Sequence, residues 1–86
     1  MRLKAVYVNQ DLRYSLERDL DTGTPYFGIP VSNTLTDYTE WYSISETEFD
    51  HFLADVDAAG QFAARCGRRE IDDRLLLKPG RDRGVY

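Results

Sequence analysis

The sequence predicts an α+β fold in which an antiparallel meander sheet of four to five strands packs on one helix or on two short helices. Three observations lead to this prediction. Apolar and polar residues alternate through much of the first 44 residues, as in strands that bury one face. Turn-forming residues interrupt the alternation at short intervals. From Ser45 onward, the apolar residues recur at helical spacing instead.

The alternating segments predict strands at residues 3–8, 12–18, 26–32 and 38–44, and the short apolar run at 74–78 predicts a buried fifth strand. Asn9-Gln10-Asp11 is a turn-prone connection between the first two strands, and Gly23 can adopt a positive φ in the next turn. Pro30 lacks the N–H that a central strand requires, so we expect its strand to lie at a sheet edge or to carry a bulge.

The helical region begins at a capping box, because Ser45 is followed three residues later by Glu48. Phe52 lies on the apolar stripe that follows and is expected in the core. One long helix could continue through this region, but Asp55 or Asp57 could also cap a second helix. Gly67 is well placed to end the helical region.

Length and composition indicate one globular domain over residues 1–86, with residues 79–86 as a candidate flexible tail. The chain is 42% hydrophobic and 30% charged, which is typical of a folded protein. It shows no signal-peptide pattern and no apolar run long enough for a membrane span, so we expect a cytoplasmic protein without a membrane partner. The single Cys66 agrees with a reducing compartment.

The net charge of −4 is unevenly distributed. Residues 1–64 carry eleven carboxylates against four basic side chains, whereas residues 65–86 carry seven basic side chains against four carboxylates. An acidic body disfavours general nucleic-acid binding, which depends on Lys and Arg. It suits a cationic protein partner instead.

The C-terminal "KPGRDRG" is the candidate for an anion site, formed by Lys78, Arg81 and Arg83. It is not a phosphate-binding P-loop, since its lysine precedes the glycine and no helix follows. A C-terminal Arg/Gly stretch is more often a solvated tail or turn, and exposed ion pairs contribute little to stability. We therefore expect a solvated tail or a turn here and not an anion site.

The preceding "RREIDDR" has a structural interpretation as well. Asp72, Asp73 and Arg74 could hold the expected fifth strand against Arg68 and Arg69 at the end of the helix.

No catalytic, metal or cofactor motif is present, so no metal ion and no cofactor are expected. The carboxylates at positions 46, 48, 50, 55 and 57 lack the ligand spacing of a calcium loop and fit the polar face of a helix. His51 lies off the apolar stripe, and Cys66 lies on it, where a buried and unreactive thiol is expected.

Trp41 is the candidate interaction residue. The alternation in residues 38–44 directs Tyr38, Tyr42 and Ile44 to one face of the sheet and Thr39, Trp41 and Ser43 to the other. If the helices cover only the first face, then Trp41, Tyr26 and Thr39 form a protein interface, most simply with a second copy of the chain across a two-fold axis. The alternative is that Trp41 is buried in a second small core.

These features favour a small acidic protein-binding module without catalytic activity of its own. The profile is shared by small bacterial immunity and antitoxin-like proteins, with no motif in common, so an inhibitory role is the corresponding expectation. Two alternatives are a small enzyme that uses His51 or Cys66, and a weak nucleic-acid-binding accessory domain that uses the basic C-terminal segment.

Overall fold

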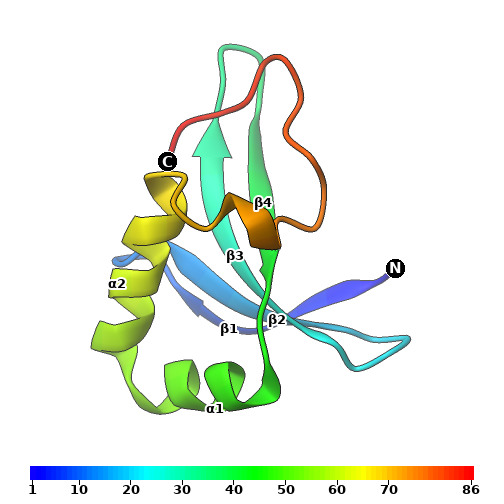
Figure 1. Cartoon of the computed structure of the whole chain (residues 1–86), viewed down its shortest axis with the longest axis vertical. Helices are drawn as coiled ribbons and strands as arrows, with labels where there is room; N and C mark the ends of the chain where they lie inside the picture. The colour runs from blue at the N-terminus through cyan, green and yellow to red at the C-terminus, as the bar shows by residue number, and fades with distance from the viewer.

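The computed structural model describes all 86 residues and has the predicted α+β fold, with a four-stranded antiparallel meander in the order β1-β2-β3-β4 and two helices on it (Figure 1). The elements are β1 (Leu3–Asn9), β2 (Tyr14–Asp19), β3 (Pro25–Ser32), β4 (Asp37–Ser43), α1 (Glu46–Ala54), α2 (Val56–Gly67) and a 3-10 turn, η1 (Asp72–Arg74).

The first hairpin forms at the predicted turn, although β2 begins two residues later than the alternation suggested. The Asn9 side-chain oxygen accepts the Leu12 N–H at 2.9 Å, and Arg13 adopts a positive φ of 58°. These two features extend the turn through Arg13. A register shift between Ala5 and Tyr7 leaves β1 with a bulge.

Pro30 does not place its strand at the edge of the sheet, because β3 lies between β2 and β4. The expectation of an edge strand is therefore wrong for β3 as a whole. The pairing of β2 with β3 ends at Gly28, however, so Pro30 lies in a part of β3 that pairs only with β4, opposite Thr39. Its missing N–H leaves no partner on β2 unsatisfied.

The helical region consists of two short helices, and its predicted start is confirmed. The Ser45 hydroxyl accepts the Glu48 N–H at 3.0 Å, and the Glu48 carboxylate accepts the Ser45 N–H at 2.9 Å. Asp55 ends α1 and caps α2 by accepting the Ala58 N–H at 3.0 Å. The turn between the helices lets both lie against the sheet.

The core lies between the sheet and the helices. Its centre is Phe27, which stacks on Tyr14 and meets Phe52 and Phe62 edge-on. All the buried members of this cluster are Tyr14, Leu16, Phe27, Ile29, Val31, Tyr42, Ile44, Phe49, Phe52, Ala59, Phe62, Ala63, Cys66 and Ile71. The core positions predicted for Tyr42 on β4, for Ile44 just after it and for Phe52 on α1 are therefore correct.

Residues 74–78 do not form a fifth strand. Leu75 makes a single bridge to Tyr42, and the Leu76 N–H donates to the Trp41 carbonyl at 2.8 Å. Leu77 is already 68% exposed, so the apolar run leaves the β4 edge after one contact. Pro79 and Gly80 follow at once and prevent further pairing.

The end of the chain is packed against the domain. Ser32 and Val85 exchange two backbone hydrogen bonds at 3.0 and 2.9 Å, and the Gly84 N–H donates to the Tyr38 hydroxyl at 2.6 Å. The Tyr86 hydroxyl donates to the Leu12 carbonyl at 2.8 Å. These contacts involve residues 84–86 of the stretch considered as a candidate flexible tail.

Packing of Tyr86 explains why residue 67 is a glycine. A Cβ on Gly67 would overlap the Tyr86 ring, so the glycine provides room for the last residue of the chain. The positive φ near the end of α2 occurs at Arg69, at 65°, and not at Gly67. Gly67 ends the helix as predicted, but close packing and not a left-handed backbone accounts for it.

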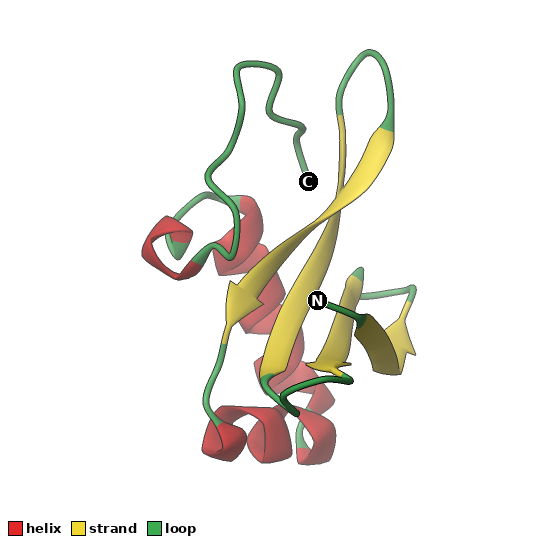
Figure 2. Cartoon of the chain, turned by 90° about the vertical axis from the view of Figure 1, so that its right-hand side faces the viewer, coloured by secondary structure: helices red, strands yellow, loops and turns green.

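The two faces of the sheet are covered differently. The helices lie on one face, and the C-terminal segment passes beside the far end of the β3–β4 hairpin (Figures 1 and 2). We call the face toward the helices the inner face and the opposite one the open face. Neither helix has the length and apolar character that a membrane span requires.

Candidate binding surface on the open face of the sheet

The open face is built from the alternate residues that do not enter the core. The strand register places Glu17 beside Tyr26, and Ser15 beside Gly28, which in turn lies beside Trp41. Thr39 and Pro30 form the next pair toward the hairpin tip. This face therefore has a polar side on β2 and an aromatic side on β3 and β4.

Trp41 lies half-buried on this face, with its indole fixed by a hydrogen bond. The Trp41 Nε1–H donates to Glu17 Oε2 at 3.0 Å, and the Ser15 hydroxyl donates to the same oxygen at 2.7 Å. Because Ser15, Glu17 and Trp41 come from two strands separated by β3, this network crosses the middle of the sheet. It fixes the orientation of the ring while leaving part of its surface accessible.

The other two predicted interface residues differ in accessibility. Thr39 is half-buried beside Trp41 on β4, as expected. Tyr26 is only 8% exposed, although it lies outside the core cluster. It therefore offers a partner little surface.

The open face is concave on the side of β1. A hollow of about 420 Å³ is lined by residues of all four strands, including Ala5, Val8, Ser15, Glu17 and Thr39. Curvature of the sheet thus gathers side chains that lie far apart in the sequence.

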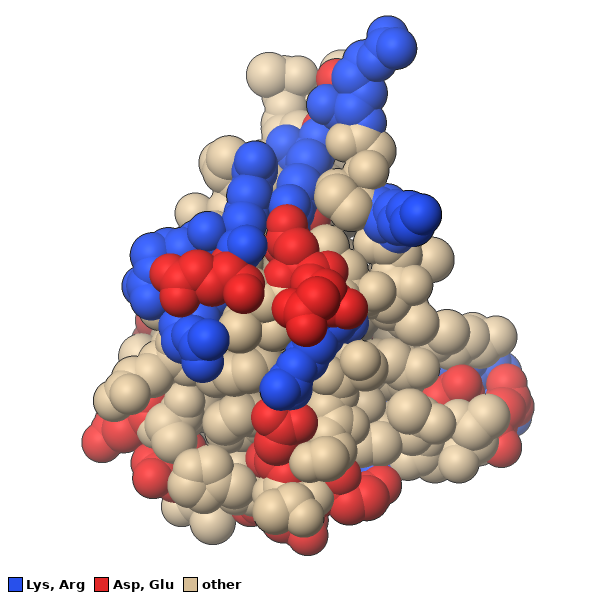
Figure 3. Space-filling model, viewed as in Figure 1, with Lys and Arg blue, Asp and Glu red and all other residues tan.

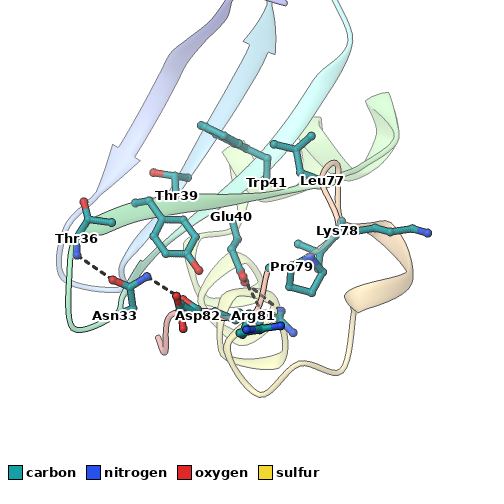
Figure 4. Close-up of a pocket in the computed structure, with 14 residues that line it drawn as sticks. Asn33, Thr36, Thr39, Glu40, Trp41, Leu77, Lys78, Pro79, Arg81 and Asp82 are labelled. Carbon is teal, nitrogen blue, oxygen red and sulfur yellow. Dashed lines mark hydrogen bonds and ion pairs between the residues drawn. The ribbon is translucent and has the colours of Figure 1, made fainter.

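A second hollow of about 550 Å³ lies beside β4, where residues 77–83 leave the strand and return to it (Figure 4). Trp41 and Thr39 line one side of this loop hollow, and Thr39 also lines the first one. The two depressions therefore meet at Thr39, next to Trp41. A bound chain segment could contact both.

The predicted anion-site residues Lys78, Arg81 and Arg83 all line the loop hollow, so the structure brings them near Trp41 and Thr39. Lys78 and Arg81 are exposed, and Lys78 extends away from the hollow (Figure 4). Neither forms an ion pair. Anion binding by these two residues stays a prediction.

The expectation of a solvated stretch is wrong for Arg83. Its side chain is 10% exposed and donates to two carboxylates, Glu40 at 2.8 and 3.1 Å and Asp72 at 2.7 and 2.8 Å. Glu40 is itself only 8% exposed and also accepts a hydrogen bond from the Tyr42 hydroxyl at 3.1 Å. Arg83 therefore fastens the C-terminal segment to the inner face.

The pairing of Arg83 with Asp72 shifts the pKa of both groups in the direction that favours their charged forms. Hydrogen bonds from Arg83 hold the pKa of Asp72 below its usual range, and those to Asp72 and Glu40 raise the pKa of Arg83. Burial, followed by the charge of Glu40, raises the pKa of the Tyr42 hydroxyl. With both of its guanidinium edges occupied, Arg83 has little capacity left for an external anion.

The basic residues of "RREIDDR" pair differently from the prediction. Arg68 donates to Glu70 at 2.6 Å, and Arg74 donates to Glu48 of α1 at 2.8 and 3.0 Å. Acidic side chains are interleaved with the basic ones over the C-terminal residues (Figure 3). Much of the C-terminal basic charge is thus neutralised within the chain.

No hydrogen bond joins the side chains of His51 and Cys66. Cys66 is fully buried, and burial raises the pKa of its thiol to about 12, which disfavours the nucleophilic thiolate. His51 is exposed on α1, and no hydrogen bond joins its ring to a carboxylate or a thiol. No three His, Cys, Asp or Glu side chains cluster closely enough to hold a metal ion.

The chain matches no protein-family model, and no curated protein or solved structure is significantly similar to it.

Sequence reasoning found Trp41 and Thr39 but missed Glu17 and Ser15. Both follow from the register, because each lies opposite a residue of β3 that in turn lies opposite β4. The alternation of Glu17 with Leu16 carried part of this signal, as it placed Glu17 on the face away from the core. Which strands are neighbours was the missing information.

Proposed function

We propose that the protein is a non-catalytic protein-binding module that engages a partner through the open face, with Trp41 as the central anchor. The observation that carries this proposal is the difference in coverage between the two faces. The helices and the C-terminal segment cover the inner face, whereas no helix lies on the open face, where Trp41 remains partly exposed near a concave surface.

Several properties support this function. Tryptophan is enriched at the energetic centres of protein interfaces. The hydrogen bond to Glu17 holds the indole in place before binding, which lowers the entropy lost on association. The net charge of −4 favours a basic partner. A small acidic module of this kind could act as an inhibitor by covering a basic site on its partner.

The test compares proteins captured by the wild-type chain with those captured by Trp41→Ala. Leu53→Ala is the matched control, because Leu53 is an exposed apolar residue on α1, on the opposite side of the sheet. We expect quantitative mass spectrometry to identify a protein that is retained by wild type and by Leu53→Ala but is lost with Trp41→Ala. Once purified, that partner should bind Trp41→Ala about 30-fold more weakly, which corresponds to roughly 2 kcal/mol.

Identical capture by all three chains would contradict the proposal. Sedimentation velocity over a range of concentrations tests the homodimer predicted from the sequence. A dimer that dissociates on Trp41→Ala, but not on Leu53→Ala, would identify a second copy as the partner.

A further inference from the structure

Glu17 is a half-buried carboxylate that has hydrogen bonds but no counter-ion. Its Oε2 accepts both bonds of the network, from Ser15 and from Trp41, and no hydrogen bond within the chain reaches Oε1. Seven ion pairs form in the chain, and Glu17 belongs to none of them. A partly desolvated carboxylate in this position gains from a cation that the chain itself does not supply.

Two basic side chains that lie near Glu17, those of Arg18 and Arg13, are engaged elsewhere. Arg18, the next residue on β2, donates to Glu46 at 2.8 Å and lies over the Phe49 ring on the helical side. Arg13 lines the concave hollow, but its guanidinium stacks over the Tyr86 ring at 4.4 Å. Lys78 and Arg81 form no ion pair, but they line the loop hollow and not the concave hollow that Glu17 lines. The charge of Glu17 is therefore available to a bound molecule.

The backbone opposite Glu17 is adapted to this arrangement. A Cβ on Gly28 would lie 2.6 Å from the Ser15 hydroxyl oxygen and 2.9 Å from Glu17 Oε2. Because glycine has no side chain, the carboxylate can lie against β3 and reach the Trp41 indole on β4. Any larger residue at position 28 would displace the carboxylate or the hydroxyl.

We infer that the open face binds a cationic side chain, the arginine or lysine of a basic protein partner, between the Glu17 carboxylate and the Trp41 ring. Glu17 supplies an ion pair through its free oxygen, and Trp41 supplies the aromatic surface that cations prefer. This inference rests on the proposed function and specifies the chemistry of the partner. A second copy of the chain fits less well, because two copies joined face to face bring their Glu17 carboxylates toward each other.

The test uses the single tryptophan as a reporter, since the chain has one indole N–H signal in a ¹⁵N-labelled sample. The probes are two capped tripeptides, acetyl-Gly-Arg-Gly-amide and the same peptide with citrulline, which has the shape of arginine without its charge. We expect the arginine peptide to shift the indole signal saturably and to bind about tenfold more tightly than the citrulline peptide.

Two variants separate the proposed site from general charge attraction. Glu17→Gln keeps a hydrogen-bond acceptor for Ser15 and Trp41 but removes the charge, so the preference for arginine over citrulline should disappear. Asp57→Asn makes the same change in net charge on α2, which packs against the inner face, and should keep the preference.

Three results would overturn the inference: no indole shift with arginine, equal binding of the two peptides by wild type, or an unchanged arginine preference in Glu17→Gln. None of these results affects the capture comparison with Trp41→Ala, which tests the proposed function separately. A partner could also be captured through Trp41 and bind Glu17→Gln as tightly as wild type. That result would support the proposed binding module and contradict the cation site.

Discussion

Two glutamates of the sheet, Glu40 and Glu17, have carboxylates that are partly or fully removed from water, and they are stabilised in different ways. Glu40 points to the inner face, is almost fully buried, and receives a counter-ion from the C-terminal segment through Arg83. Glu17 points to the open face, is half-buried, and receives two hydrogen bonds but no cation. A buried carboxylate requires an internal partner, whereas one at the surface can be left for an external partner.

The comparison also shows how a chain of this size stabilises its sheet. The helices do not cover all of the inner face, and the remaining part near the hairpin tip is covered by the last residues of the chain. Arg83, Gly84 and Val85 attach to β4 and β3 by an ion pair and by hydrogen bonds. The C-terminal segment is therefore part of the fold.

The largest expected effect comes from Arg83→Ala. This substitution leaves Glu40 buried without a counter-ion and should lower the free energy of unfolding by about 3 kcal/mol or more. Urea denaturation measures the change, and Arg81→Ala is the matched control. Because Arg81 is exposed and forms no ion pair, its variant should stay within about 0.5 kcal/mol of wild type. Equal midpoints for the two variants would show that the Arg83 network contributes nothing to stability.

A smaller effect should appear in the pH dependence of stability. Arg83 holds the pKa of Asp72 below its unfolded value, so the unfolded chain takes up the proton first as the pH falls. The stabilisation from this pair is complete above the unfolded pKa of about 4 and is lost as the pH falls through the lower folded pKa. Denaturation at several values between pH 7 and pH 2.5 should show a weaker acid dependence in Asp72→Asn than in wild type. Parallel curves would show that Asp72 is not coupled to Arg83.

The sequence was sufficient to predict the elements that depend on local patterns. The alternation around Phe27 and the capping box at Ser45 each involve residues within a few positions of one another. The cap of α2 was narrowed to Asp55 or Asp57, and the structure shows Asp55. The Trp41 face followed from the same alternation. The C-terminal contacts could not be predicted in this way, because Arg83 meets Glu40 from 43 positions away and Tyr86 meets Leu12 from 74 positions away. An Arg/Gly stretch looks the same in a sequence whether it is solvated or docked.

The candidate site was only partly predictable for a related reason. Trp41 and Thr39 stand out by residue type and by alternation, but the Glu17–Trp41 hydrogen bond depends on which strands are neighbours and on a glycine between them. Gly28 looks like an ordinary strand glycine in the sequence. Its role becomes evident once the register places it between Ser15 and Trp41.

The smallest expected effect on stability comes from substitution of Glu17, the glutamate on the open face. Glu17→Gln should change the free energy of unfolding by no more than about 0.5 kcal/mol, because the glutamine oxygen can still accept the Ser15 and Trp41 hydrogen bonds and no ion pair is lost. Glu40→Gln, in contrast, removes one of the two charges that neutralise Arg83 and should be clearly destabilising in the same urea titration. A large loss of stability in Glu17→Gln would show that the Glu17 carboxylate serves the fold, and its lack of a counter-ion would then no longer point to an external cation. A small loss, with the indole signal of Trp41 unchanged, would leave the negative charge on the open face without a structural role.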